Sequence, residues 1–560
     1  MIKSITRKLS RIFSKREDSR PARFHSVDHQ SKMAIQSQQT SLDDAKQNED
    51  ELQVAQKHLG LAEKCKSEND IKEAIQRYQD SLAIAKKQGH KEMEESSIRE
   101  LSKLTDTEDL NHLTEKTASP SRVPETIVSW NERSIFHREK LKNLCEYAKT
   151  NPEEIRVVNG VYVCCSEEFL IGQGSQGTCV YVGLGTDGVE KAVKRLVRNT
   201  SSSLAKQEMK ILSELNTKSK HVINYWFLEE QCDKDFLYLI LDLCEETLEN
   251  FVKRSSQTDL VRCAPDIIRQ VLKGLADLHR DPNPILQRDL KPSNILRNIQ
   301  DNWLLADFGI SRILKEGMTT HLSSSRGTED WKAVESCSSK GGADDSNVRY
   351  KKESDIQVIG MVAFYILTKG KHPFGGKPDR LRNLLDDKPV GLDNLKDDAA
   401  KDLISWMLNH DPKDRPSAKE ALKHPYLQPA KQQFEMLCKI GNQPEIKTQD
   451  VKSDVVRKLN SNPEDWRSKI PADDLTYLFT VCLEGRPVSY EPSFTRLLQL
   501  MRNVEQHWHD RPRPRPEVFY IVDNPQKYFL NLFPSLCVEV HKIIRSCDWK
   551  QRDDLKEYFH

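Results

Sequence analysis

Five short motifs between residues 171 and 335 contain the residue types that bind phosphates and metal ions and that transfer protons. The first is the run Ile171–Gly177, which reads IGQGSQG. Glycines allow a backbone to approach phosphate groups where a side chain would clash, although the same spacing also occurs in ordinary turns and in dinucleotide-binding folds. The function of this loop is therefore decided by the motifs that follow it.

The other four motifs supply charged and hydrogen-bonding side chains in a fixed order along the chain. They read KAVK at Lys191–Lys194, QRDLKPSN at Gln287–Asn294, DFG at Asp307–Gly309 and AVE at Ala333–Glu335. Each motif alone is weak, but the succession at this spacing is specific and is similar to that of protein kinases. Residues 167–427 are therefore identified as a protein kinase domain, which has a bilobal α+β fold.

The resemblance to protein kinases implies a role for each motif residue. Asp289 would accept the proton of the substrate hydroxyl, and Lys291 would stabilise the transferring phosphoryl group. Lys194, paired with Glu208 from a helical run, would hold the α- and β-phosphates of ATP. The remaining ATP contacts that the family implies are Ile171, Gly172, Gly174, Gly177, Val180, Ala192 and Leu243.

The resemblance also implies a magnesium site formed by Asp307 and Asn294, because Mg²⁺ prefers hard oxygen ligands. One residue departs from the family pattern, since Gln287 stands where protein kinases usually have histidine. In protein kinases that histidine mainly supports the catalytic loop. Its replacement by Gln287 is therefore expected to affect catalytic efficiency more than the reaction chemistry. Because the catalytic and metal-binding residues are all present, the sequence favours a competent kinase over a degraded nucleotide sensor.

The activation segment of this domain, Asp307–Glu335, is rich in hydroxyl side chains. Its candidate phosphorylation sites are Thr319, Thr320, Ser323, Ser324 and Ser325. A phosphate in this segment would order it by pairing with an arginine such as Arg288, beside the catalytic aspartate. Serines are also common in exposed loops, so the sequence does not single out one of them.

The last 130 residues contain a second cluster of candidate catalytic groups. A helical pattern over Phe494–Trp508 includes the run LLQLMRNVEQH, which passes from an apolar face to polar groups. This run, together with DWR at Asp465–Arg467, is similar to the kinase-extension nuclease (KEN) domain. That domain follows the kinase in stress sensors of the inositol-requiring type and in the oligoadenylate-dependent ribonuclease. Residues 430–560 are thus identified as an all-α KEN domain.

The KEN resemblance implies metal-free RNA cleavage, in which a 2′-hydroxyl attacks the neighbouring phosphate and leaves a cyclic phosphate. The reaction needs groups that take up and release a proton and groups that stabilise charge on the phosphorane. His507 suits proton transfer near neutral pH, and Tyr490 is the matching phenol. Arg502 and Asn503 would hold the phosphate. In a helix, Asn503 and His507 are four residues apart and share a face.

Two further features of the C-terminal region concern partners. Arg496 stands where the nuclease family commonly has an acidic residue. Because the family cleaves as a dimer, this charge reversal would alter the contacts between subunits. The run Arg511–Pro516, which reads RPRPRP, is either a grip for RNA phosphates or a stiff solvated loop.

The chain before the kinase domain divides into three segments. Residues 1–25 form a basic amphipathic tail that would lie on an anionic membrane surface, serve as a transit peptide or remain disordered. Residues 50–105 are rich in helix formers and fit either a tetratricopeptide-like helix pair or a plain helical hairpin. Prolines and serines at 119–124 mark residues 106–150 as a linker.

Composition limits the class of protein. The 560 residues suggest three or four folding units, and 86 basic against 85 acidic side chains exclude a histone-like, uniformly basic protein. No apolar run reaches the roughly 18 residues of a bilayer helix, and the chain does not open with a secretory signal. Thirteen cysteines without a CxxC pair argue against a disulfide framework or a zinc site. We therefore expect a cytoplasmic protein.

The resemblances to protein kinases and to the KEN domain imply a dual enzyme. A serine/threonine kinase would bind ATP and Mg²⁺, autophosphorylate and form a homodimer through both domains, and the dimer would activate a C-terminal endoribonuclease that cleaves RNA. The alternative is a kinase or nucleotide-binding pseudokinase scaffold whose C-terminal unit only docks partners or dimerises. The N-terminal region would contact a protein partner or a membrane surface, with no transmembrane segment.

Overall fold

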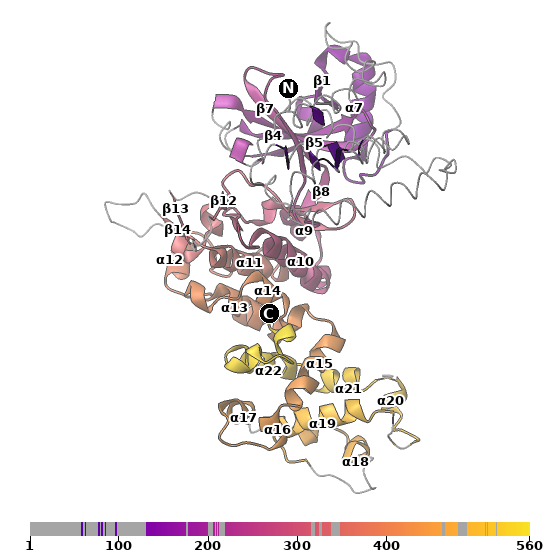
Figure 1. The fold of residues 1–560 in the computed structure, drawn as a ribbon, viewed down its shortest axis with the longest axis vertical. Helices are drawn as coiled ribbons and strands as arrows, with labels where there is room; N and C mark the ends of the chain where they lie inside the picture. Colours follow the sequence, from indigo (N-terminus) through magenta and orange to yellow (C-terminus); the bar gives the residue numbers. More distant parts are fainter. Residues whose placement is uncertain are drawn as a thin grey trace. The chain divides into compact units, whose positions relative to one another are not determined.

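The computed structural model describes residues 130–560 with gaps, together with single residues between 56 and 97 (Figure 1). The gaps are residues 175–176, 200–204, 208, 210, 212–218, 315–317, 319, 324–327, 338–347, 462–464, 480–489, 510, 512 and 522–523. The chain divides into two compact units, Met1–Arg122 and Val123–His560. None of the helices in the described parts has the length and hydropathy that crossing a bilayer requires.

The first unit is described only at isolated positions, all of them helical. Ala62, Tyr78 and Ala85 are fully buried, as is expected for helices that pack on one another. The basic tail at 1–25 lies outside the described residues. For residues 50–105, the tetratricopeptide-like pair and the plain hairpin both remain predictions.

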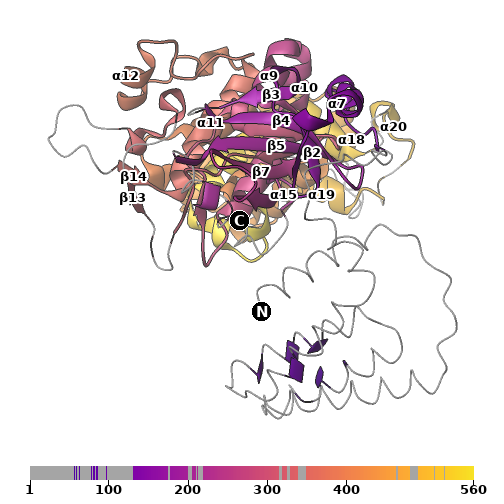
Figure 2. The ribbon, with the colours of Figure 1, turned by 90° about the horizontal axis from the view of Figure 1, so that it is seen from above.

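The second unit begins with an antiparallel sheet of seven strands, which forms the smaller lobe of the kinase (Figures 1 and 2). In spatial order the strands are β1 (Arg156–Val158), β2 (Val161–Val163), β4 (Cys179–Gly185), β5 (Glu190–Val197), β7 (Phe236–Asp242) and β6 (Tyr225–Glu229), with β3 (Leu170–Gln173) paired to β4. The register places Lys194 of β5 between Val180 of β4 and Leu239 of β7. The lysine predicted to bind phosphates is therefore held by strands on both sides.

Helix α7 (Arg138–Thr150) packs on this sheet, in a segment where the sequence predicts a linker. The linker prediction is wrong for residues 138–150. Leu141, Leu144 and Ala148 follow a helical spacing and are buried in the kinase core, so this stretch forms an amphipathic helix.

Two buried carboxylates hold the chain that leads into α7. Glu190 accepts the Trp130 indole N–H at 2.7 Å and the backbone N–H groups of residues 133–134 at 2.9 and 2.8 Å. Glu245 accepts the backbone N–H groups of residues 135–136. Buried carboxylates require such partners, so the chain from residue 130 belongs to the kinase unit.

The larger lobe of the kinase is mainly helical. Its helices are α9 (Leu248–Arg254), α10 (Gln257–Leu278), α11 (Lys352–Leu367), α12 (Arg380–Leu385), α13 (Asp398–Leu408) and α14 (Ala418–Leu422). Short strands carry its loops: β8 (Cys244–Thr247) and β11 (Trp303–Leu305) flank β10 (Ile295–Asn298), β9 (Ile285–Leu286) pairs with β12 (Arg312–Ile313), and β13 (His321–Ser323) pairs with β14 (Val348–Tyr350). Helix α11 is apolar and buried on nearly every side, so it forms the centre of the lobe.

The remaining helices form the C-terminal domain, whose described residues contain no strand. They are α15 (Ala430–Gly441), α16 (Pro444–Lys447), α17 (Asp454–Leu459), α18 (Ala472–Phe479), α19 (Phe494–Gln506), α20 (Val518–Ile521), α21 (Pro525–Leu532) and α22 (Leu536–Arg545). Helix α19 is central, because Leu497, Leu498, Met501 and Val504 on its successive turns are fully buried. The prediction of a bilobal α+β domain followed by an all-α domain is confirmed.

Short 3₁₀ turns connect the elements of both domains. They are η1 (Pro152–Glu154), η2 (Glu167–Phe169), η4 (Pro292–Asn294), η5 (Glu329–Trp331), η6 (Val334–Ser336), η7 (Leu392–Asn394), η8 (Pro412–Asp414), η9 (Pro425–Leu427), η10 (Trp466–Lys469), η11 (Asp548–Gln551) and η12 (Lys556–Tyr558).

A buried carboxylate, Asp402 on α13, joins the kinase to the C-terminal domain. Its oxygens accept hydrogen bonds from His424 at 3.0 Å and from Arg545 of α22 at 3.1 Å. Burial alone would raise the pKa of Asp402, but these two donors hold it well below its ordinary value. The Arg545 guanidinium also lies over the Trp406 ring, 4.3 Å from its centroid. One ionised group is thus shared by both domains.

Aromatic rings surround this joint. The rings of His424 and His541 lie 5.1 Å apart, and His541 stacks on Phe559 at 4.9 Å. Burial lowers the pKa of His541 well below its ordinary value, so the ring packs in its neutral form. The joint therefore combines one paired charge with uncharged rings from both domains.

Replacing Asp402 with Asn should destabilise the joint. The change leaves the Arg545 guanidinium buried without its anion, and breaking a buried ion pair costs about 3–5 kcal/mol of unfolding free energy. Urea unfolding of the full chain, followed by tryptophan fluorescence, measures the loss. Asp393→Asn is the matched control, because Asp393 pairs with Lys401 at an exposed site where water screens the charges. Equal urea midpoints for the two variants would contradict the assigned role of Asp402.

Candidate active sites

The catalytic loop of the kinase brings Asp289, Lys291 and Asn294 into one hydrogen-bonded group. The Lys291 ammonium donates to Asp289 Oδ2 at 2.7 Å, and the Asn294 amide donates to the same atom at 2.9 Å. All three lie between β9 and β10 within a few residues of one another, so the local chain sets their spacing. Two donors orient the Asp289 carboxylate, which is the group suited to accept a hydroxyl proton.

A fourth member of this group is Thr328, which the sequence does not single out. Its hydroxyl donates to Asp289 Oδ1 at 3.0 Å and accepts from the Lys291 ammonium at 2.8 Å. Its backbone N–H donates to Asp289 Oδ1 at 3.1 Å. Thr328 lies in the Gly327–Trp331 stretch, and only the folded activation segment returns it to the catalytic loop. The only sequence feature that points to Thr328 is the presence of a threonine in the Gly327–Trp331 stretch.

Lys194 and Asp307 form the charged part of the site. The Lys194 ammonium lies 3.1 Å from Asp307 Oδ1 and holds the pKa of Asp307 below its ordinary value, so the carboxylate stays ionised. The nitrogen of the Asn294 amide bonds to Asp289, which leaves the amide oxygen to face a cation. A carboxylate and an amide oxygen suit a hard divalent ion. Glu208, the predicted partner of Lys194, lies outside the described residues.

The glycine-rich loop connects β3 to β4. The Gly174 N–H donates to the Thr178 carbonyl at 2.8 Å and closes the hairpin, while Gly177 has a φ of +76°, a conformation that favours glycine. The apolar residues predicted to contact the nucleotide all pack on the main kinase core: Ile171, Val180, Ala192 and Leu243. Apolar side chains beside a glycine-rich loop and a lysine fit a ligand that combines a flat base with phosphates.

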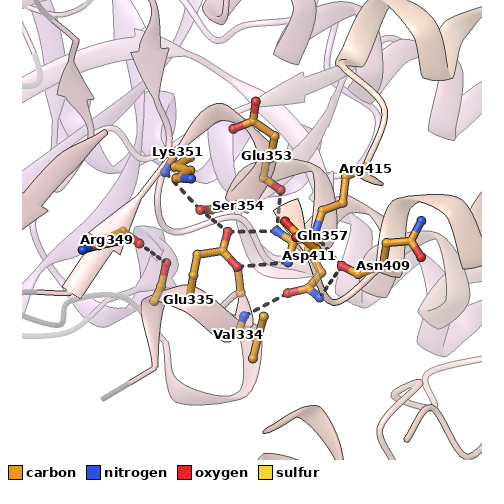
Figure 3. Close-up of polar contacts among 12 residues, drawn as sticks. Val334, Glu335, Arg349, Lys351, Glu353, Ser354, Gln357, Asn409, Asp411 and Arg415 are labelled. Atoms are coloured by element: carbon orange, nitrogen blue, oxygen red, sulfur yellow. Dashed lines mark hydrogen bonds and ion pairs between the residues drawn. The ribbon is translucent and has the colours of Figure 1, made fainter. Parts of the chain in front are cut away.

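A buried ion pair anchors the end of the activation segment (Figure 3). Arg415 donates to both carboxylate oxygens of Glu335, at 2.8 and 3.0 Å, and its side chain is completely buried. Ser354 of α11 donates a further hydrogen bond to Glu335. A bidentate arginine–carboxylate pair restricts the orientation of both groups and is also a strong contact. The pair therefore holds the activation segment against α11.

A second anchor joins Val334 to Gln357 of α11 (Figure 3). The Val334 backbone N–H donates to the Gln357 side-chain oxygen at 2.9 Å, and the Gln357 amide donates to the Leu408 carbonyl at 3.1 Å. Protein kinases usually have proline at the Val334 position, and proline has no N–H to satisfy. Gln357 therefore accepts the one donor that valine introduces at this position.

In the C-terminal domain, Tyr490 and Asn503 are in direct contact. The Asn503 amide donates to the Tyr490 hydroxyl at 2.6 Å, and the Tyr490 side chain is buried. The neighbouring Arg502 donates to Gln506 at 2.8 Å, on the last turn of α19. The structure thus brings the predicted phenol and the two predicted phosphate-binding groups to the same end of one helix.

His507 lies just beyond this helix. The sequence predicts a helix over Phe494–Trp508, whereas α19 ends at Gln506 and His507 is its C-cap residue. The predicted end is wrong because the Trp508 ring turns into the core beside Phe519. The His507 backbone N–H still donates to the Asn503 carbonyl at 3.1 Å, so the last turn keeps these two residues close.

The Arg-Pro run after α19 is buried at its first arginine and exposed further on. Arg511 is buried and donates to two backbone carbonyls of α18, at 3.1 and 3.2 Å. Arg515 lies over the Trp508 ring, 4.1 Å from its centroid. Of the three arginines in the run, only Arg513 is exposed. Arg511 and Arg515 therefore pack on the domain, and contact of the run with RNA phosphates stays a prediction.

Arg496, which stands where the nuclease family commonly has an acidic residue, contacts its own helix. Its guanidinium donates to Gln499 at 2.8 Å, and Gln499 in turn donates to two backbone carbonyls of α16, at 3.2 and 3.1 Å. The expected effect of Arg496 on contacts between subunits stays a prediction.

Comparison with known proteins agrees with this arrangement of two domains. Residues 166–427 match the protein kinase domain family, and residues 433–559 match the family described as ribonuclease 2-5A. The serine/threonine-protein kinase/endoribonuclease ire-1 of Caenorhabditis elegans is 31% identical over 403 residues, which cover 68% of this chain and 39% of the relative. The human serine/threonine-protein kinase/endoribonuclease IRE2 is 30% identical over 398 residues, or 68% and 41% of the two chains.

The folds and the two sites define a protein kinase joined to a ribonuclease domain. The chain is similar to serine/threonine-protein kinase/endoribonucleases, and it contains a protein kinase domain followed by a ribonuclease 2-5A domain. It spans about two fifths of the length of these two relatives.

Removing the Gln357 carboxamide should destabilise the kinase domain. Gln357→Leu leaves the Val334 N–H without an acceptor, which costs about 1–3 kcal/mol of unfolding free energy. Val334→Pro in the same chain removes that N–H and should restore part of the loss. Proline fits because Val334 is the first residue of η6 and Ala333 before it is extended. Urea unfolding of both single variants and the double variant measures the coupling energy between residues 334 and 357. Strictly additive changes in unfolding free energy would contradict the hydrogen bond between them.

Proposed function

We propose that this chain is a serine/threonine kinase whose ATP binding and autophosphorylation favour a homodimer, which activates its C-terminal endoribonuclease. One observation supports the proposal: in each domain, predicted catalytic side chains are held together by hydrogen bonds. In the kinase, Lys291 and Asn294 both bond to Asp289. In the C-terminal domain, Asn503 bonds to Tyr490 on the helix end that leads to His507. A binding scaffold would require neither set.

In the kinase, Asp289 would take the proton of a serine or threonine hydroxyl as its oxygen attacks the γ-phosphorus of ATP. The bond from that phosphorus to the β,γ-bridging oxygen breaks, and ADP leaves with the electron pair. Lys291, bonded to Asp289 and Thr328, would hold positive charge beside the transferring group. Asp307 and Asn294 would hold Mg²⁺, which neutralises charge on the phosphates when it is bound.

In the C-terminal domain, a 2′-oxygen of RNA would form a bond to the adjacent phosphorus, and the bond from phosphorus to the 5′-oxygen would break. The products are a cyclic phosphate and a 5′-hydroxyl. One group removes the 2′-proton and another protonates the 5′-oxygen, and His507 and Tyr490 are the two groups available. Arg502 and Asn503 would hold the phosphate oxygens and stabilise the charge of the phosphorane.

The homodimer would couple the two reactions. Because the Asp402 joint ties α13 to α22, a dimer that orders the kinase would also set the position of the nuclease helices. We further propose a cytoplasmic location, with the basic tail at 1–25 in contact with a protein partner or a membrane surface.

His507→Ala should reduce RNA cleavage by at least about 100-fold, because it removes a group that transfers a proton in the reaction. Autophosphorylation should stay unchanged. A labelled structured RNA and radiolabelled ATP in the same tube report both activities. His509→Ala is the matched control, since it removes an exposed histidine two residues further on. Cleavage at the wild-type rate by His507→Ala would sink the nuclease assignment.

Lys194→Ala and Asp307→Ala should each stop autophosphorylation, because they remove the phosphate-binding cation and the metal-binding carboxylate. Phosphate incorporation from radiolabelled ATP is the measurement. Asp301→Asn, at an exposed turn of the larger lobe, should leave incorporation unchanged. If phosphate incorporation persists in both active-site variants, the kinase site has been assigned to the wrong residues.

A further inference from the structure

We infer that Gln287, where the kinase motif departs from its family, is a positioning residue for both the catalytic and the metal-binding aspartate. The inference deepens the proposed kinase function and rests on it. Gln287 is fully buried, and its carboxamide lies between the catalytic loop and the segment that carries Asp307.

The Gln287 carboxamide makes three hydrogen bonds. Its nitrogen donates to the backbone carbonyls of Ala306 and Asp307, at 3.0 and 3.1 Å. Its oxygen accepts the backbone N–H of Asp289 at 2.7 Å. Only this orientation of the amide is chemically consistent, because a carbonyl can only accept and a backbone N–H can only donate. One side chain therefore ties together the two loops that carry the reacting groups.

These hydrogen bonds lie next to two residues whose backbone conformation is unfavourable for side chains other than glycine. Arg288 and Asp307 have φ angles of +71° and +61°, a region that residues other than glycine rarely occupy. Such conformations persist only where the surrounding contacts hold them. The Gln287 amide bonds to the residue after Arg288 and to the carbonyl of Asp307 itself, while Asp355 accepts the backbone N–H groups of Gln287 and Arg288. Without the amide, both loops lose a direct restraint.

A carboxamide can make these contacts at once, whereas the histidine usual in the family cannot. In a neutral imidazole, the single N–H and the acceptor nitrogen point away from each other across the ring. In a carboxamide, the donor and the acceptor lie side by side, so one can face the Asp307 carbonyl while the other faces the Asp289 N–H. Gln287 therefore restrains the catalytic aspartate and the metal-binding segment at the same time.

The test replaces Gln287 with Met, which has similar length without hydrogen bonds, or with His, which keeps one donor. Hydrogen exchange of the full chain without nucleotide, read by mass spectrometry, compares the segments 287–290 and 304–311. We expect exchange in both segments of Gln287→Met to be about fivefold faster or more, as for the loss of one hydrogen bond. In Gln287→His, faster exchange should be confined to 287–290.

A second readout separates positioning from general support of the fold. For phosphorylation of a serine peptide, Gln287→Met should lower kcat by about tenfold or more, with the KM for ATP changed less than about threefold. Gln443→Met is the matched control, because Gln443 is a buried glutamine of the C-terminal domain whose carboxamide also makes three hydrogen bonds, to Lys439, Asp554 and Arg552. It should leave kcat and the exchange of both segments unchanged.

Wild-type exchange and wild-type kcat in Gln287→Met would overturn the inference, and so would equal effects of Gln443→Met. If Gln287→Met does not fold, the Gln287→His chain decides, since unchanged exchange over 287–290 would equally overturn it. A wild-type chain that phosphorylates nothing would refute the proposed kinase function. The exchange of the two segments would still test the positioning role, because it does not depend on activity.

Discussion

The ionised carboxylate of Asp402 is the contact on which the arrangement of the two catalytic domains depends. A charge in a protein interior is stable only when a partner of opposite sign and further hydrogen bonds compensate for lost water. Here α13 of the kinase supplies the anion and Arg545 of α22 supplies the cation, so neither domain satisfies its buried charge alone. Rings from both domains, among them Trp406 and His541, fill the surrounding space. The larger kinase lobe and the C-terminal helices therefore share one buried, charged contact.

The local motifs predicted that Asp289, Lys291 and Asn294 lie together, because these residues are close together in sequence. What the sequence did not predict depends on long-range contacts. Thr328 reaches Asp289 from 39 residues away, and the chain before α7 is held by Glu190 and Glu245 across 56 to 110 residues. In the nuclease, the helical pattern identified α19 but not its end, which is set by the packing of Trp508.

Departures from the kinase pattern are compensated by hydrogen bonds. Val334 brings an N–H where the family has none, and Gln357 supplies its acceptor. Gln287 replaces an imidazole and bonds to both catalytic segments. A missing motif residue is therefore weak evidence for lost activity when neighbouring groups form hydrogen bonds with the residue that replaces it. Such compensation cannot be read from a motif, because it involves residues far apart in the chain.

In the proposed function, the state of the kinase controls the nuclease. The most direct measurement is the initial rate of RNA cleavage by the full chain, over a range of chain concentrations, with and without ATP. The account predicts that ATP raises the rate and that the rate rises more steeply than in proportion to chain concentration, as an active dimer requires. A rate that is independent of ATP and proportional to chain concentration would contradict it.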